Sequence, residues 1–87
     1  MNKKRIVIAD DHALFRNGLR MLIGQNEKYE VVAEASNGKE LIEVLEQTEA
    51  DLILLDISMP EMDGIEAAGI ITERFPQIPI LTLSMFG

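Results

Sequence analysis

The sequence predicts an α/β domain in which helices cover both faces of a parallel β-sheet. Short apolar runs without polar alternation recur along the chain, and each of the first three is followed by a helical pattern. A continuous apolar run of this kind is typical of a strand that is buried on both faces. The resulting order, β-α-β-α-β-α-β, favours right-handed crossovers that bring all four strands into one sheet.

The first strand is predicted at residues 6–9 (Ile-Val-Ile-Ala) and the second at residues 31–33 (Val-Val-Ala). Between them, residues 13–24 carry apolar pairs three or four positions apart, which predicts a helix with one apolar face. Gly24, the last residue of this segment, is expected to end the helix. The apolar pairs are Leu14/Phe15, Gly18/Leu19 and Leu22/Ile23.

The remaining elements follow in the same alternation. A second helix is expected after Asn37, because Glu40 stands three residues later in a pattern related to the capping box. Residues 52–55 (Leu-Ile-Leu-Leu) predict the third strand. Residues 64–75 predict a third helix that ends before a proline, and residues 79–83 predict the fourth strand.

Composition excludes several classes of function. The 87 residues suffice for one small domain, and 8 basic against 15 acidic residues give a net charge of −7, the wrong sign for binding DNA directly. Without cysteine there are no disulfides or thiolate metal sites. No apolar run approaches the ~20 residues that span a bilayer, and we see no signal peptide. We therefore expect a cytoplasmic domain that does not contact a membrane.

Acidic residues end two of the predicted strands. Asp10 and Asp11 follow the first strand, Asp56 follows the third, and a hydroxyl, Ser84, follows the fourth. In open α/β sheets, ligands bind outside the carboxyl ends of the strands, where the strand order reverses. If the first and third strands are neighbours, three carboxylates and a hydroxyl converge on one edge of the sheet.

Three carboxylates at close range repel one another unless a cation lies between them. Oxygen ligands, with no histidine or cysteine expected nearby, favour Mg²⁺ or Mn²⁺. In such a pocket a carboxylate can act as a nucleophile toward phosphorus and form an aspartyl phosphate. We expect the only histidine, His12, to be a surface residue of the first helical turn. Asp10 or Asp11 is expected to cap that helix as well.

The ordered motifs resemble the receiver domain of bacterial two-component response regulators. The residue sequence around these motifs is similar to that of the NarL/FixJ-type subfamily, whose members usually carry a C-terminal helix-turn-helix of the LuxR kind. The resemblance implies a flavodoxin-like fold with strand order 2-1-3-4, and it spans essentially all 87 residues. The motifs that carry it are IVIADDH (6–12), LILLD (52–56), SMPEMDG (58–64) and ILTLS (80–84).

The resemblance implies a role for each matching residue. Asp56 is similar to the phosphoacceptor, which takes a phosphoryl group from a sensor histidine kinase. Asp11 resembles the residue that binds Mg²⁺ directly, and Asp10 the residue that acts largely through water. Ser58 is expected to lend its backbone carbonyl to the metal. Ser84 resembles the hydroxyl residue that contacts the phosphoryl group and reports phosphorylation.

The sequence departs from this family after the fourth strand. Receiver domains continue with a fourth helix, a fifth strand that ends in a phosphoryl-contacting lysine, and a fifth helix, whereas no lysine follows Lys39 here. We therefore expect residues 1–87 to be a partial receiver domain without an effector domain, with impaired phosphotransfer. DNA binding would require a C-terminal helix-turn-helix that this chain lacks. The fourth strand would be an apolar edge that favours self-association.

Three functions remain open from the sequence. The leading one is a phosphoacceptor domain that switches a transcriptional regulator and is not an enzyme in its own right, although it can catalyse its own phosphorylation and dephosphorylation. The alternative is a receiver-like scaffold for protein interaction that is never phosphorylated. A phosphohydrolase of the haloacid-dehalogenase kind is disfavoured, because that family needs an Asp two residues after the nucleophile, where this chain has Ser58.

Overall fold

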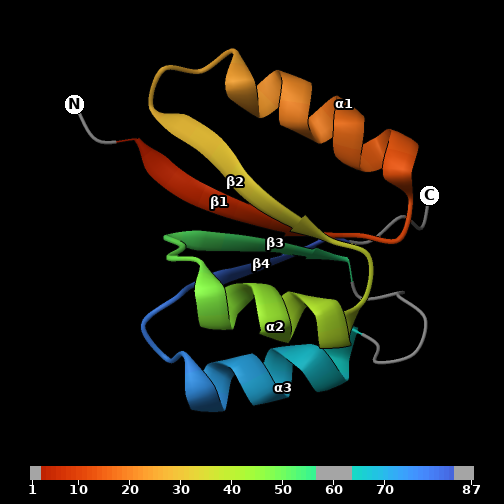
Figure 1. Cartoon of the computed structure of the whole chain (residues 1–87), viewed down its shortest axis with the longest axis vertical. Coiled ribbons are helices and arrows are strands. Elements are labelled where there is room, and N and C mark those ends of the chain that lie inside the picture. Colours follow the sequence, from red (N-terminus) through yellow and green to blue (C-terminus); the bar gives the residue numbers. More distant parts are fainter. Residues whose placement is uncertain (1–2, 57–63, 84–87) are drawn as a thin grey trace.

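A four-stranded parallel sheet with helices on both faces forms the domain (Figure 1). The computed structural model describes residues 3–56 and 64–83. Its strand order is β2-β1-β3-β4, so the predicted fold class and strand order are confirmed. The elements are β1 (Lys4–Ala9), α1 (Ala13–Gly24), β2 (Tyr29–Ala35), α2 (Gly38–Gln47), β3 (Leu52–Asp56), α3 (Gly64–Arg74) and β4 (Ile80–Leu83).

The central strand β1 is buried on both faces, as its unbroken apolar sequence predicts. Successive side chains of a strand point to opposite faces of the sheet. Val7 and Ala9 accordingly join the apolar cluster on one face, and Ile6 and Ile8 join the cluster on the other. Burial on both faces fixes the register of β1, because a slip by one residue would exchange the two sets of side chains.

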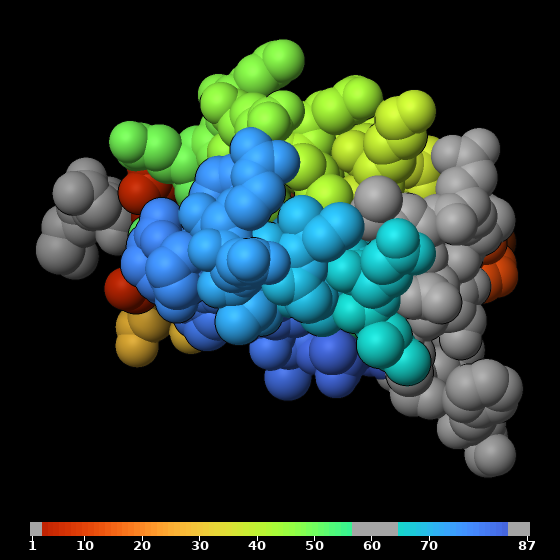
Figure 2. Space-filling model, turned by 90° about the horizontal axis from the view of Figure 1, so that it is seen from below, coloured from red at the N-terminus to blue at the C-terminus, as the bar shows by residue number. Residues whose placement is uncertain are grey.

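Helices α2 and α3 cover one face of the sheet. Figure 2 shows the two helices side by side, with β4 on the side of α3 that faces away from α2. Leu41 of α2 and Ile71 of α3 are fully buried against Ile53 and Leu55 of β3. The predicted cap of α2 is confirmed, since Asn37 Oδ1 accepts a hydrogen bond of 2.8 Å from the Glu40 amide.

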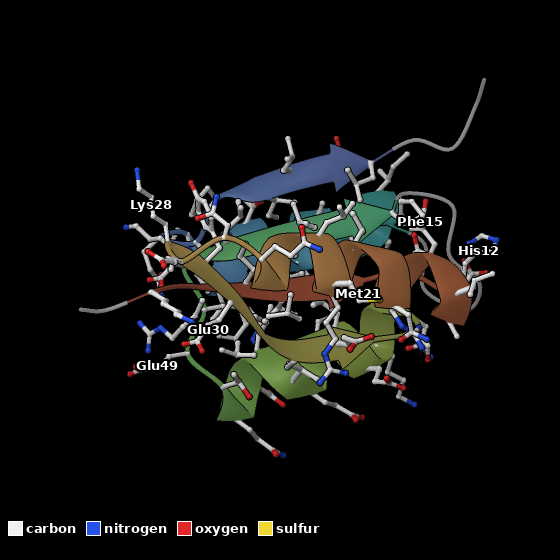
Figure 3. The ribbon with its side chains drawn as sticks, turned by 90° about the horizontal axis from the view of Figure 1, so that it is seen from above. His12, Phe15, Met21, Lys28, Glu30 and Glu49 are labelled. Atoms are coloured by element: carbon white, nitrogen blue, oxygen red, sulfur yellow. The ribbon has the colours of Figure 1, made fainter. Side chains whose placement is uncertain are left out.

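Among the described residues α1 is the only helix on the other face, and only half of its predicted apolar stripe is even partly buried. Leu19 and Ile23 pack against Ile6 and Ile8 of β1, whereas Leu14 and Leu22 remain 85% and 67% exposed. In Figure 3, α1 lies over the middle of the sheet and leaves β4 uncovered on this face. With 12 residues α1 is the longest described helix, and no helix in residues 3–56 and 64–83 is long and apolar enough to cross a membrane.

The strand bounds differ from the sequence-based ones where polar residues join the sheet. β2 spans Tyr29–Ala35 instead of residues 31–33 because it pairs with β1 from Lys4↔Tyr29 to Ala9↔Ala35, with one register shift between Ile6 and Val7. Backbone hydrogen bonds extend a strand regardless of side-chain polarity, so an apolar pattern detects only its middle. For the same reason β1 begins two residues earlier than predicted, at Lys4.

Arg5 and Asp51 join β1 to the start of β3 at the amino-end edge of the sheet. The Arg5 amide donates to Asp51 Oδ2 at 2.7 Å, and the Asp51 amide donates to the Arg5 carbonyl at 2.7 Å. The guanidinium Nε also lies 3.2 Å from Asp51 Oδ2. These contacts lower the pKa of Asp51, with the hydrogen bond from the Arg5 side chain as the main cause.

The effect of replacing Asp51 with asparagine is therefore expected to depend on pH. Because the pKa is lower in the folded state, the carboxylate stabilises the fold above its unfolded pKa, and this contribution disappears as the pH falls through the folded value. Urea unfolding followed by circular dichroism should show wild type more stable than Asp51→Asn above about pH 5, with the difference shrinking toward about pH 2. A difference that is constant with pH would contradict the assignment.

Candidate functional site

The register of β1 against β3 brings Asp10 and Asp56 together. Ala9 is level with Leu55, so the next residue of each strand lies at the same carboxyl-end edge of the sheet. The Asp10 amide donates to the Ala35 carbonyl at 2.9 Å, which ties this position to the end of β2 as well. Both carboxylate residues are 0% exposed, although most ionised side chains remain in water.

Four side chains form one cluster at this edge. Ligand atoms of Asp10, Asp11, His12 and Asp56 all lie within 4.8 Å of one another. The predicted convergence of the three acids is therefore observed. Ser58 and Ser84, the two other predicted site residues, lie outside the described residues.

His12 lies closer to the acids than its sequence position predicted. It is exposed, as predicted, but its imidazole Nδ1 lies 3.0 Å from Asp10 Oδ1 and 3.0 Å from Asp11 Oδ1, so the expectation of no histidine near the acids is wrong. In Figure 3 it lies at the amino end of α1. A signal was present, since His12 directly follows the acid pair at the turn into the helix.

The helix cap also differs from the expectation. The residue at the N-cap position of α1 is His12, and its side chain makes no capping hydrogen bond, so neither Asp10 nor Asp11 occupies that position. Instead, the His12 amide donates to Asp10 Oδ1 at 2.7 Å. This bond holds the turn against Asp10 and fixes one of the two oxygens of the buried carboxylate.

The acids around His12 raise its pKa above the usual value of a histidine. The largest cause is the hydrogen bond to Asp10, followed by the negative charge of Asp11. Hydrogen bonding to the charged form and nearby opposite charge both favour the imidazolium. The cluster therefore attracts positive charge, which is the property required of a cation site.

Arg16 anchors the site from the first turns of α1. Its guanidinium donates to the Asp10 carbonyl, and its Nε lies 3.2 Å from Glu34 Oε1 on β2. The side chain is only 18% exposed, so solvent screens these contacts less than contacts on an open surface. Arg16 was not predicted as a site residue, because nothing in a one-dimensional pattern pairs it with Glu34.

The donor set fits a divalent cation. Asp10 Oδ2 is buried and has no hydrogen-bond partner among the described residues. Burying a carboxylate oxygen without a partner costs free energy unless a ligand binds to it. Carboxylate oxygens are the ligands that Mg²⁺ and Mn²⁺ prefer. The pocket thus combines a buried orphan oxygen, two further carboxylates and a short distance between them.

The sequence model of the response regulator receiver domain matches residues 6–87. The chain belongs to the response regulator receiver family. The receiver domain is 46% identical over 83 residues to the uncharacterized transcriptional regulatory protein YhcZ of Bacillus subtilis, covering 95% of this chain and 39% of that protein. The chain therefore spans well under half the length of this curated relative.

Solved structures agree with the fold of this receiver domain. The response regulator RcsB of Salmonella typhimurium superposes with a TM-score of 0.90 at 35% identity, over 99% of this chain and 44% of RcsB. A two-component response regulator of the LuxR family from Aurantimonas superposes with a TM-score of 0.91 at 34% identity, over 99% of this chain and 61% of that one. The resemblance to NarL/LuxR-type response regulators is thereby confirmed.

Proposed function

We propose that this receiver domain is a phosphoacceptor, with Asp56 as the residue that carries the phosphoryl group. The observation that supports this most directly is the juxtaposition of Asp56 with Asp10, Asp11 and His12 within 4.8 Å at the carboxyl-end edge of the sheet. Asp56 ends β3 and is 0% exposed as a residue, so the strand holds its carboxylate in one place. A fixed nucleophile reduces the entropy lost on reaching the transition state.

The proposed reaction transfers a phosphoryl group from the phosphohistidine of a sensor kinase. An oxygen of the Asp56 carboxylate forms a bond to phosphorus while the phosphorus–nitrogen bond breaks, and the leaving imidazole keeps the electron pair and takes a proton from solvent. A divalent cation bound by Asp10, Asp11 and Asp56 would offset the negative charge that accumulates on the phosphoryl oxygens. Ser58 and Ser84 are proposed to assist through the backbone carbonyl and the hydroxyl respectively.

The test is the intact mass of the protein after incubation with acetyl phosphate and Mg²⁺. We expect an adduct of one phosphoryl group that is absent from Asp56→Asn and absent when EDTA replaces Mg²⁺. For a polypeptide of these 87 residues we expect slow labelling, because none of residues 40–87 is a lysine that could contact the phosphoryl oxygens. Glu43→Gln, which removes an exposed carboxylate on α2, is the control and should be labelled like wild type.

Two outcomes would contradict the proposal. An adduct that persists in Asp56→Asn would assign the acceptor to another residue. A wild-type chain that is labelled neither by acetyl phosphate nor by a phosphorylated sensor kinase would favour the alternative, a receiver-like interaction scaffold.

The partners proposed for this domain are a sensor histidine kinase and, in a longer regulator, a DNA-binding effector domain. YhcZ is described as a transcriptional regulatory protein, and the Aurantimonas structure as a LuxR-family regulator. The receiver domain itself carries a net charge of −7, so we assign DNA contact to the effector domain alone. Phosphorylation of Asp56 would then switch that effector domain.

Self-association through β4 is a further expectation for the 87-residue chain. Within the described residues β4 is an edge strand, and its Leu81 is 53% exposed. Exposed apolar edges pair readily with another copy, and a lysine on the edge opposes this pairing. Size-exclusion chromatography with light scattering should show concentration-dependent association that Leu81→Lys reduces. Leu14→Lys, on the exposed side of α1, should leave it unchanged, and the reverse pattern would place the contact on α1 instead.

A further inference from the structure

We propose that His12 is a nitrogen ligand in the acidic pocket, so that the site favours divalent transition metals such as Mn²⁺ over Mg²⁺. This inference rests on the cation site of the proposed function and adds one ligand and one metal preference to it. Its starting point is the distance of 3.0 Å from His12 Nδ1 to an oxygen of each of Asp10 and Asp11.

The spacing of the four side chains is close to that of one coordination sphere. With metal–ligand bonds of about 2.1 Å in octahedral geometry, adjacent ligand atoms lie about 3 Å apart and opposite ones about 4 Å apart. The distance of 3.0 Å from Nδ1 to Asp11 Oδ1 equals an adjacent spacing, and the ligand atoms of the four residues lie within 4.8 Å of one another, slightly beyond an opposite spacing. Small shifts of the side chains would therefore bring His12 Nδ1 and the carboxylates onto one cation.

The two oxygens of Asp10 have different partners in this arrangement. Oδ1 accepts the His12 amide at 2.7 Å, which fixes the turn that carries the imidazole. Oδ2 is buried and has no hydrogen-bond partner among residues 3–56 and 64–83, so it is the oxygen left for a cation. The orphan oxygen is an observation independent of the acidic cluster, and it indicates that the pocket takes a ligand.

An imidazole in the ligand set changes which metals the pocket prefers. Carboxylates alone suit Mg²⁺ and Mn²⁺ similarly, whereas imidazole nitrogen binds first-row transition metals and is a poor ligand for Mg²⁺. On binding, Nδ1 donates its lone pair to the metal, and any proton that it carried passes to solvent. The competing arrangement is an imidazolium that only neutralises the acids and leaves when a cation enters.

The experiment compares metal binding by wild type, His12→Ala and Leu14→Ala. His12 is exposed and its side chain makes no cap hydrogen bond, so its removal is not expected to unfold the domain, which circular dichroism checks. Leu14→Ala is the control for a change in the same helical turn, at a side chain that is 85% exposed. Calorimetry gives the dissociation constants for Mn²⁺ and Mg²⁺, and electron spin-echo modulation of bound Mn²⁺ detects a coordinated ¹⁴N nucleus.

We expect ¹⁴N modulation in wild type and in Leu14→Ala but not in His12→Ala. The affinity of His12→Ala for Mn²⁺ should fall about tenfold or more, while its affinity for Mg²⁺ stays the same or rises. Bound Mn²⁺ without ¹⁴N modulation in wild type, or equal losses for the two metals, would overturn the role of His12. That failure is distinct from failure of the proposed function, because Mg²⁺-dependent labelling of Asp56 would still be observed.

Discussion

Asp10→Asn is expected to be more stable than wild type in the absence of divalent cations. Asp10 and Asp56 are both 0% exposed and lie in one cluster with Asp11, so their negative charges repel one another away from water. Asparagine removes one of these charges, keeps an oxygen to accept the His12 amide and offers an N–H group to the neighbouring carboxylates. We expect the free energy of unfolding to rise by about 0.5–2 kcal/mol, as is common where a binding site is built at the expense of stability.

Added Mg²⁺ should reverse this order. A cation that binds only the folded state stabilises it by RT ln(1 + [Mg²⁺]/Kd), which reaches about 2.7 kcal/mol at a hundredfold excess over the dissociation constant. Wild type should gain this stability and Asp10→Asn should gain less, because the orphan oxygen has been replaced. Urea unfolding followed by circular dichroism, with EDTA and across a Mg²⁺ titration, measures both effects.

The control is Glu43→Gln, which lowers the net negative charge by the same amount at an exposed position of α2. It should change the stability by less than about 0.5 kcal/mol and leave the response to Mg²⁺ intact. If Glu43→Gln stabilises the chain as much as Asp10→Asn, the effect comes from the overall charge of −7 and not from repulsion within the pocket.

The largest loss of stability is expected from Leu41→Ala. Leu41 is 0% exposed and belongs to the apolar cluster between α2, α3 and the sheet. Truncation to alanine loses apolar burial and leaves a cavity, at about 2–5 kcal/mol for buried leucines. Small domains have only about 5–15 kcal/mol in total, so this variant should show a much lower urea midpoint.

Leu22→Ala makes the same chemical change on α1, where the side chain is 67% exposed. Both sites are helical, and alanine is the best helix former, so helix propensity affects the two variants alike. Leu22→Ala should therefore lie within about 0.5 kcal/mol of wild type. A large loss at Leu22 would mean that α1 buries this residue in solution, for example against a second copy.

The fold was predictable because its strands are strongly patterned. β1 has no polar residue from Ile6 to Ala9, and β3 has none from Leu52 to Leu55. Such continuous apolar runs predict strands of a parallel sheet that is covered on both faces. The ends of β2 were not predictable, since Tyr29 and Glu30 join the sheet through backbone pairing with Lys4 and Arg5. The exposure of half of the apolar stripe on α1 could not be predicted, because the sequence does not say how many helices cover each face.

The acidic part of the site was predictable for a different reason. Asp10, Asp11 and Asp56 stand directly after strands, and parallel strands bring such positions to one edge. His12 was predicted only as a surface residue and Arg16 was not predicted at all, because their contacts with the site depend on how the chain turns into α1. Their partners are an acid oxygen for His12 and the Asp10 carbonyl for Arg16, and neither contact follows from spacing along the chain.

The central place of β1 also sets the order in which the site can form during synthesis. β1 leaves the ribosome before β2 and β3, and its pairing with β2, from Lys4↔Tyr29, is the nearer of its two pairings along the chain. β3 must then dock on the other side of β1, which requires a longer loop to close. Asp10 and Asp11 stay apart from Asp56 until that step, so the repulsion among them opposes the docking of β3. Divalent cations would favour this late step, and nascent chains should fold more completely when these cations are present.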